Sequence, residues 1–305
     1  MLVLELGHKE RIESLAFSPD GGSLVTPSAT GVHIWRGFAS GARPARLPGH
    51  GAPRLAQFTH DGRWLFVTSS TVTRIDPTGS GFVDWDVPVR FYTFFDVSPV
   101  AGLIVINQNL VAGPNTSRLS CWRIDDPSPA GKVWERNLPF AFYNRPRFLP
   151  DGTRFVRLEG GWVRERHRAE YATVIYSTAT GEPVHTSAPH ASHSSDVSVS
   201  PDGRWFVGLD TNRVHLWPLG PGEVGQIKND GRRHFTSAAF HPSGRYLAVT
   251  SNDATVKLFD TTNWELARTF TWNIGRMRSV AFSPDGALAA AGSDKGQVIV
   301  WDVDG

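Results

Sequence analysis

The 305-residue chain has a single cysteine, Cys121. One cysteine cannot form an intrachain disulfide framework, and it excludes a zinc site built from several thiolates. No apolar run approaches the roughly 20 residues that a membrane-spanning helix needs, and no heptad pattern is sustained. The first residues carry no basic segment and Glu5 interrupts their apolar stretch, so we expect neither a secretory signal nor a membrane partner. These absences favour a cytoplasmic protein.

An excess of charge of either sign is also missing, because 31 basic and 29 acidic side chains give a formal net charge of +2. This balance argues against a polybasic protein that coats nucleic acid. Hydrophobic residues make up 40% of the chain, which is enough for a sizeable core. The 30 glycines and 21 prolines fall short of a disordered composition.

One phrase recurs along the chain: an apolar anchor residue, a turn of the type Ser-Pro-Asp-Gly, and a second apolar run. Proline fixes φ in such a turn, Asp or Ser bonds its own backbone, and Gly accepts a positive φ. The anchors are Phe17, Phe58, Val97, Phe148, Val199, Phe240 and Phe282. Their separations, 39 to 51 residues, are typical of a β-propeller.

Each turn is followed by an alternating segment that ends in an aromatic or aliphatic residue. These segments are Val32–Trp35, Val72–Ile75, Leu119–Trp122, Val174–Tyr176, Val214–Trp217, Val256–Phe259 and Val298–Trp301. Period-two alternation between Gly and Asn clusters predicts strands. We predict no helix.

These repeats resemble the WD-repeat β-propeller family. Trp301-Asp302 is the dipeptide that names the family, and Gly7-His8 and Gly49-His50 match its Gly-His pair. The resemblance extends over the whole chain. It implies an all-β fold, a seven-bladed propeller of four-stranded antiparallel blades, in one domain over residues 1–305. No blade keeps the family's full His, Ser/Thr, Asp and Trp tetrad, so we expect the blades to depend on packing.

Ring closure can be counted from the anchors. The 23 residues after Phe282 and the 17 up to Phe17 together make 40, one further repeat. The chain ends just after the third strand of blade seven. We therefore expect Leu2–Leu6 to form the outer strand of that blade and to close the ring.

Two blades are longer than the others between their second and third strands. The extra residues are 107–117 in blade three and 159–171 in blade four. Family topology places this connection on the face called the top, where we expect two neighbouring long loops, which are often functional. The second segment contains Trp162, Arg164 and Arg168. It is either a solvated hairpin whose arms extend the strands or a finger that contacts an anion or a peptide.

The same face is expected to carry the residues that lie six and four positions before each anchor. The first set is Arg11, Ala52, Phe91, Phe142, His193, His234 and Arg276, and the second is Glu13, Arg54, Thr93, Asn144, Ser195, Thr236 and Arg278. Exposed aromatic and Arg side chains are typical of interface hot spots. The other interpretation is that these residues line the seams between blades. We predict a partner site made of Arg11, Phe91, Phe142, Arg145, Trp162, Arg164, Arg168, His193, His234, Arg276 and Arg278.

Motifs that would carry chemistry are missing or lack their context. The glycines of 220–225 match a dinucleotide-binding pattern, but no helix is expected to follow them, so we interpret them as a turn. His190 and His193 lie in a loop segment rather than on a helix. No nucleophile elbow or phosphate-binding loop is present. We predict no catalytic residue, no metal site and no cofactor.

The sequence favours a non-catalytic protein–protein interaction scaffold, which we expect to be monomeric. Its partner would be a protein or peptide, acidic or phosphorylated, bound on the top face near blades three and four. An anion or nucleic-acid binder that uses Arg11, Arg54, Arg276 and Arg278 is the alternative, although we do not expect nucleic acid to be the partner. A propeller enzyme is a third possibility, weakened by the single carboxylate, Glu13, in the projecting positions.

Overall fold

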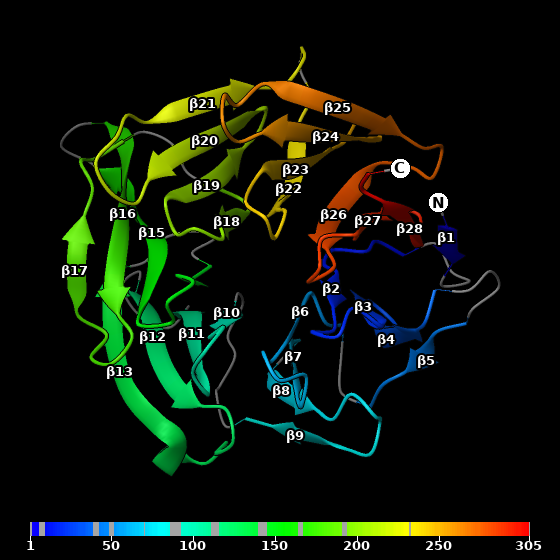
Figure 1. Ribbon diagram of the computed structural model, residues 1–305. Coiled ribbons are helices and arrows are strands. Elements are labelled where there is room, and N and C mark those ends of the chain that lie inside the picture. The colour runs from blue at the N-terminus through cyan, green and yellow to red at the C-terminus, as the bar shows by residue number, and fades with distance from the viewer. Residues whose placement is uncertain are drawn as a thin grey trace.

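The computed structural model describes residues 2–5, 10–38, 43–48, 52–69, 71–85, 93–110, 116–139, 145–163, 167–190, 194–231 and 233–304. The side chains of Leu2, Glu5, Leu110, Thr116, Pro139, Trp162, Val163 and Arg168 are outside this description. Seven four-stranded antiparallel sheets stand around a ring, as the sequence predicts (Figure 1). The described helical element is one 3-10 turn, Pro129–Gly131.

Each blade consists of strands that follow one another from the channel outward, and blade seven takes its outermost strand from the N-terminus. Blades one and two contain β2 (Ala16–Phe17), β3 (Ser23–Ser28), β4 (Gly31–Arg36), β5 (Ala45–Arg46), β6 (Leu55–Phe58), β7 (Leu65–Thr68), β8 (Val72–Ile75) and β9 (Phe82–Asp84). Blades three and four contain β10 (Thr93–Val97), β11 (Leu103–Leu110), β12 (Thr116–Arg123), β13 (Lys132–Pro139), β14 (Arg147–Phe148), β15 (Arg154–Val163), β16 (Arg168–Ser177) and β17 (Pro183–Thr186). Blades five to seven contain β18 (Val197–Val199), β19 (Trp205–Asp210), β20 (Arg213–Pro218), β21 (Gly225–Lys228), β22 (Phe235–Phe240), β23 (Tyr246–Ser251), β24 (Thr255–Asp260), β25 (Leu266–Thr271), β26 (Met277–Phe282), β27 (Leu288–Ser293), β28 (Gln297–Asp302) and β1 (Leu2–Glu5).

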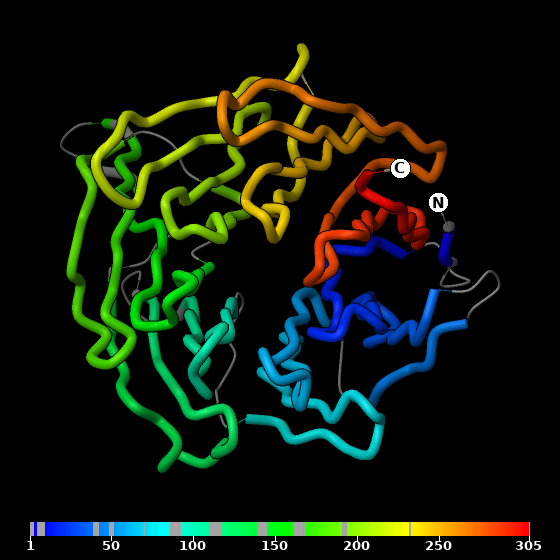
Figure 2. Tube along the Cα trace, viewed as in Figure 1, coloured from blue at the N-terminus to red at the C-terminus, as the bar shows by residue number. Residues whose placement is uncertain are grey.

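The predicted closure by the N-terminal strand is confirmed. Strand β1 pairs antiparallel with β28, from Leu2 opposite Val300 to Glu5 opposite Gln297. The two ends of the trace therefore lie close together (Figure 2). Leu4 is buried in the seam between blades seven and one, where it packs with apolar residues of both. This packing gives the closing strand a hydrophobic as well as a hydrogen-bonded contribution.

The recurring turn phrase joins each inner strand to the second strand of its blade. In blade one Gly21 adopts φ +71° and donates its N–H to the carbonyl of Ser18 at 2.8 Å. The Asp20 carboxylate accepts the N–H of Gly22 at 3.0 Å and the hydroxyl of Ser18. The hydroxyl bond, followed by the N–H bond, holds the pKa of Asp20 below its usual range. The phrase is thus a self-bonded tight turn.

Strand register defines the two faces of the ring. Thr93 at the start of the inner strand β10 pairs with Gln108 near the far end of β11. The starts of the inner strands and the β11–β12 connection therefore share one face, the top face. The Ser-Pro-Asp-Gly turns lie on the opposite face, which we call the bottom face.

The long segments of blades three and four are mostly strand. Pairing of β11 with β12 continues to Leu110 opposite Thr116, and pairing of β15 with β16 continues to Val163 opposite Arg168. Both arms of the blade-four hairpin extend the strands, as the hairpin interpretation predicts. The loops expected over 107–117 and 159–171 are wrong for the described residues 107–110, 116–117, 159–163 and 168–171, which are strand, and residues 111–115 and 164–166 lie outside the described residues. The prediction assigned the extra length of these blades to loops, whereas the added residues lengthen paired strands, and Asn107 among them is fully buried.

Seven apolar cores, one at each seam between neighbouring blades, hold the described residues together. Between blades one and two, for example, Val25 and Ile34 pack against Leu65 and Ile75. Alternate residues of a strand face opposite neighbours, so each blade contributes to two cores. Within the described ranges, no helix combines the length and apolar character needed to cross a bilayer.

Candidate functional site

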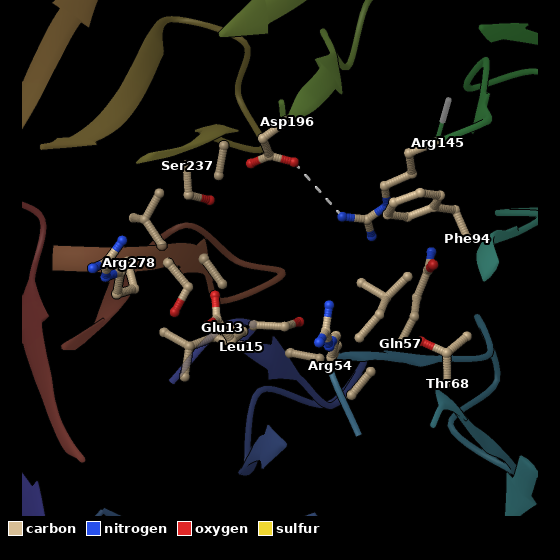
Figure 3. Close-up of a pocket in the computed structure, with 18 of the residues that line it drawn as sticks. Glu13, Leu15, Arg54, Gln57, Thr68, Phe94, Arg145, Asp196, Ser237 and Arg278 are labelled. Atoms are coloured by element: carbon tan, nitrogen blue, oxygen red, sulfur yellow. Dashed lines mark ion pairs between the residues drawn. The ribbon is translucent and has the colours of Figure 1, made fainter. Parts of the chain in front are cut away.

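The inner strands surround a central channel with a cavity of about 1010 Å³ (Figure 3). Because side chains alternate along a strand, residues three and one positions before each anchor face this space. Blades three to five contribute large or charged side chains there, among them Phe94, Arg145 and Asp196. Blades six, seven and one contribute small ones: Ser237, Ala239, Ser279, Ala281, Ser14 and Ala16. The channel therefore has one wide, small-residue wall facing a charged wall.

Two aspartates anchor the charged wall to neighbouring blades. Asp96 accepts the N–H of Phe148 at 2.7 Å and pairs with Arg147, Nη1 to Oδ1, at 3.2 Å. Asp196 accepts the N–H of Ala238 at 3.2 Å and lies 3.8 Å from Nη1 of Arg145. Each carboxylate thus connects strands of different blades, so the wall is rigid and its arginines are held in place.

Burial is the main electrostatic influence on Arg145. It lowers the pKa of the guanidinium to about 10, and the nearby positive charge of Arg147 acts in the same direction. Asp196 and Asp96 oppose this change. A pKa of about 10 leaves Arg145 charged at neutral pH, so it remains a cation in the channel wall.

Other arginines at the top of the channel have no counter-ion. Among the residues that the structure describes, Arg11, Arg54 and Arg278 line the cavity without an ion-pair partner. Glu13 lies between Arg54 and Arg278 (Figure 3). The Nε atom of Arg278 is buried without a hydrogen-bond partner. The top of the channel therefore holds several guanidinium groups without an ion pair among the described residues, beside the carboxylates of Glu10 and Glu13.

The bottom face has the opposite chemistry. Its turns carry Asp20, Asp61, Asp151, Asp202 and Asp285. A smaller cavity of about 280 Å³ lies there between blades one and two, and both Asp20 and Asp61 line it. The Thr59 hydroxyl, 2.6 Å from the carboxylate, is the main cause of a lowered pKa for Asp61. The pKa of each of these five carboxylates lies below its usual value.

The structure places the predicted site residues in different settings. Arg11, Arg145 and Arg278 line the channel. His234 and Arg276 are exposed and lie outside its lining. Trp162 and Arg168 lie near the end of the blade-four hairpin, and only their backbone is described. Phe91, Phe142, Arg164 and His193 lie outside the described residues.

Sequence reasoning missed several channel residues, including Phe94, Arg147, Asp196 and Gln57. The signal was available in the repeat itself, because these residues occupy the positions three and one before the anchors. The positions six and four before the anchors reach the channel only at its upper end. The residues that line the channel are therefore found from the alternation of side chains along each inner strand, and not from the positions that project in the family.

Two predictions about chemical motifs can be compared with the structure. The glycines of 220–225 lie in the connection from β20 to β21 and lead into a strand, which confirms the turn interpretation. Within the described ranges, no three His, Cys, Asp or Glu side chains gather in a way that could hold a metal ion.

Known proteins match this chain through its repeats. The family model for the WD domain, G-beta repeat, matches residues 2–36, 181–218, 228–260 and 264–302. Actin-interacting protein 1 of Caenorhabditis elegans is 32% identical over 123 residues, which cover 39% of this chain and 20% of that protein. Echinoderm microtubule-associated protein-like 2 of Homo sapiens is 34% identical over 118 residues, which cover 38% and 18%.

A third relative, Pre-mRNA-processing factor 19 homolog 2 of Arabidopsis thaliana, is 26% identical over 117 residues, or 37% of this chain and 22% of that protein. The chain thus spans about a fifth of the length of the curated relatives it matches. Matched repeats lie on both sides of the unmatched residues 37–180, and those residues form blades of the same four-stranded kind. By its repeats and its ring of seven blades, the chain belongs to the WD-repeat β-propeller family.

Proposed function

We propose that the protein is a non-catalytic interaction scaffold that binds an acidic protein or peptide at the top of its channel. The observation that carries this proposal is that Arg11, Arg54 and Arg278 line the cavity without an ion-pair partner among the described residues, in a chain of net charge +2. A cluster of positive charges on a nearly neutral protein attracts a negatively charged partner and raises the rate at which the two associate. WD-repeat relatives whose names describe an actin-interacting and a microtubule-associated protein agree with an interaction role.

The state of the channel carboxylates supports a non-catalytic role. Asp96 and Asp196 each bind a backbone N–H and pair with an arginine. A carboxylate held in this way is poorly placed to accept a substrate proton. We propose that the two aspartates position the inner strands.

An acidic protein segment fits the top face better than a nucleic acid does. Glu10 and Glu13 line the cavity beside the arginines, so positive charge is local rather than a continuous stripe. A nucleic-acid backbone needs a basic track along its length. We keep Phe142, which precedes the inner strand of blade four, and the hairpin residues Trp162 and Arg164 as proposed additional contacts, with the two aromatic groups as anchors.

The proposal is tested by affinity capture with two matched variants followed by titration calorimetry on each captured protein. The Arg54→Glu/Arg278→Glu double variant reverses charge on the top face, and Asp20→Ala/Asp285→Ala removes charge from the bottom face. A partner that the first variant loses and the second retains supports the proposal. A partner that the bottom-face variant loses and the top-face variant retains contradicts it.

A further inference from the structure

The hairpin of blade four extends beyond the inner strand of its own blade. Strand β14 pairs with β15 only at Phe155 and Val156, whereas β15 continues to Val163. In blade three the inner strand follows its neighbour further, since β10 pairs with β11 up to Gln108 and β11 ends at Leu110. In Figure 1, β15 lies on the channel side of β16, and β17 lies on the outer side. Beyond Val156, β15 is therefore a strand edge on the channel side, and none of the described strands pairs with it there.

The bonds of β16 show which backbone groups of β15 point to this edge. Tyr171 donates its N–H to the carbonyl of His190 and accepts the N–H of His190, both at 2.7 Å. Both polar groups of Tyr171 thus point away from β15. In an antiparallel pair the opposite residue, Gly160, must then direct its own N–H and C=O away from β16. Because this direction alternates along a strand, the backbone groups of Leu158 and Trp162 point to the same edge.

These backbone groups have no partner among the residues that the structure describes. No described group bonds to the edge-facing N–H and C=O of Leu158, Gly160 or Trp162. Gly160 and Gly161 are half-buried and place no side chains beside the edge. Glycine within a strand often marks a position where another backbone approaches closely. The edge therefore offers alternating donors and acceptors at a two-residue spacing, which a second extended polypeptide matches.

Charge near the edge indicates what kind of chain fits it. Residues 160–170 contain three arginines and two glutamates. Glu159, at the base of the hairpin, is already bonded to Tyr176 and paired with Arg157. The net positive charge disfavours pairing with the same hairpin of a second copy, because charged side chains guard strand edges against their own kind. It favours an acidic chain.

We propose that an acidic, extended segment of a partner protein binds by adding a strand to the channel-side edge of β15. Its backbone pairs with the N–H and C=O groups of Leu158, Gly160 and Trp162. In this mode the main-chain bonds supply affinity, and side chains that alternate between the two faces supply specificity. The proposal rests on the proposed function, because it gives the way in which the acidic partner is held.

Backbone methylation of a bound peptide tests the added strand. The probes are short acidic peptides selected from a display library on the full chain, and titration calorimetry measures their affinity. Methyl groups are placed on single backbone nitrogens of the tightest peptide. Every second methyl group should weaken binding at least about tenfold and those between less than about twofold, because only alternate N–H groups of an added strand face β15. Losses without this alternation, or a library that yields no binding peptide, would overturn the proposal.

The variant Trp162→Pro tests the edge of the protein. Proline removes the N–H that points to the edge and leaves the bonds between β15 and β16 in place. Trp162→Ala is the matched variant, since it loses the same ring but keeps the N–H. We expect the selected peptide to bind Trp162→Pro at least about tenfold more weakly than Trp162→Ala. Equal affinity of the two variants would contradict the added strand.

Hydrogen exchange of the unaltered chain gives a readout that does not depend on how the proline variant folds. With the selected peptide bound, exchange of the Gly160 and Trp162 amides should slow at least about tenfold. The amide of Gly161 points to β16 and should change little. Unchanged exchange at Gly160 and Trp162 would rule out backbone pairing at this edge.

The proposed function and the added strand fail in different ways. If the peptides lose affinity for Arg54→Glu/Arg278→Glu but bind Trp162→Pro and Trp162→Ala equally, the added strand fails and the proposed function stands. If they need the edge but are unaffected by Arg54→Glu/Arg278→Glu, the proposed site at the top of the channel fails and the added strand stands. A dimer that sedimentation detects in the unaltered protein, and not in Trp162→Pro, would show that a second copy occupies the edge and would overturn a partner segment.

Discussion

Two seams of the ring differ in the residue that fills the same position of the repeat. One lies between blades three and four, and the other lies between blades six and seven. Nine residues after the anchor, the second strand directs a side chain toward the preceding blade. In blade seven this residue is Ala291, fully buried in an apolar core with Ala248, Val256 and Met277. In blade four it is Arg157, also fully buried. The remaining blades have Thr26, Val67, Ile106, Gly208 and Val249 at this position.

Arg157 is tolerated because its neighbours are polar in the same place. Its Nη1 donates to Oδ1 of Asn107 across the seam at 3.1 Å, and its Nε lies 3.3 Å from Oε1 of Glu159. Glu159 in turn accepts the hydroxyl of Tyr176. A buried charge costs several kcal/mol unless it is paired and bonded, so these residues function as a unit. The comparison teaches that one residue of a repeat can depart from the pattern only if the facing blade changes with it.

The blade-four hairpin that rises from this seam has a second local requirement. Gly160 adopts φ +132°, and a Cβ atom there would lie 2.0 Å from the carbonyl oxygen of Glu170. No other residue fits at that point without moving the partner strand. The hairpin and the polar seam lie in the part of the chain that the family model leaves unmatched, 37–180, whereas blades six and seven are matched.

We expect the largest loss of stability when an arginine, the residue that stands at this position in the seam of blades three and four, is placed in the seam of blades six and seven. Ala291→Arg buries a guanidinium in the apolar seam of blades six and seven, where Thr250 and Ser293 stand at the repeat positions of Asn107 and Glu159. Desolvation of an unpaired charge and overpacking each cost kcal/mol. We expect a loss of at least about 4 kcal/mol in the free energy of unfolding, measured by urea denaturation. A loss below about 1 kcal/mol would show that the two seams are interchangeable.

A smaller loss is expected when the unit in the polar seam is broken. Arg157→Ala leaves Asn107 and Glu159 without their partner and creates a cavity, so we expect a loss of about 3–5 kcal/mol. Arg157→Met keeps most of the volume, and Glu159 keeps its bond from Tyr176, so this control should lose less. The same denaturation assay measures both variants. Equal losses for Ala and Met would mean that volume is unimportant and charge removal alone sets the cost.

The smallest effect concerns the turns, where blade three again departs from the repeat: Val100 stands where blade one has Asp20. The lowered pKa of Asp20 means that its ionised form stabilises the fold. This contribution is present above the unfolded pKa near 4 and is lost as pH falls through the lower folded value. Asp20→Asn should therefore lower the melting temperature at pH 6 by about 1–2 °C, and this difference should shrink as the pH falls below about 4.

The reciprocal variant is Val100→Asp, which gives blade three a carboxylate that its turn lacks. It should raise the melting temperature slightly at pH 6, and by less as the pH falls toward 3, measured by scanning fluorimetry over pH 3 to 6. If the change in melting temperature of either variant is the same at every pH, then ionisation of the turn carboxylate does not contribute to stability.

Much of the fold could be predicted because its signals are local. The turn phrase and the alternation of Val298–Trp301 depend on residues next to each other, so seven copies fix seven blades. The closing strand was predicted over Leu2–Leu6 by counting residues to the next repeat, and it is observed over Leu2–Glu5. Even the three-residue helical turn at Pro129–Gly131, which no pattern indicated, changes nothing in this arrangement.

The burial of polar residues was decided only by tertiary structure. Asn107 was placed in a loop because blade three is long, and Arg157 is 50 positions away in sequence, yet the two side chains meet across a seam. Asp196 and Arg147 likewise gain their partners from neighbouring blades, at Ala238 and Asp96. Turn and strand propensities act between adjacent residues and can be read along the chain. Pairing of buried charges depends on which residues of the neighbouring blade lie opposite. The short distances between such residues exist only in the closed ring.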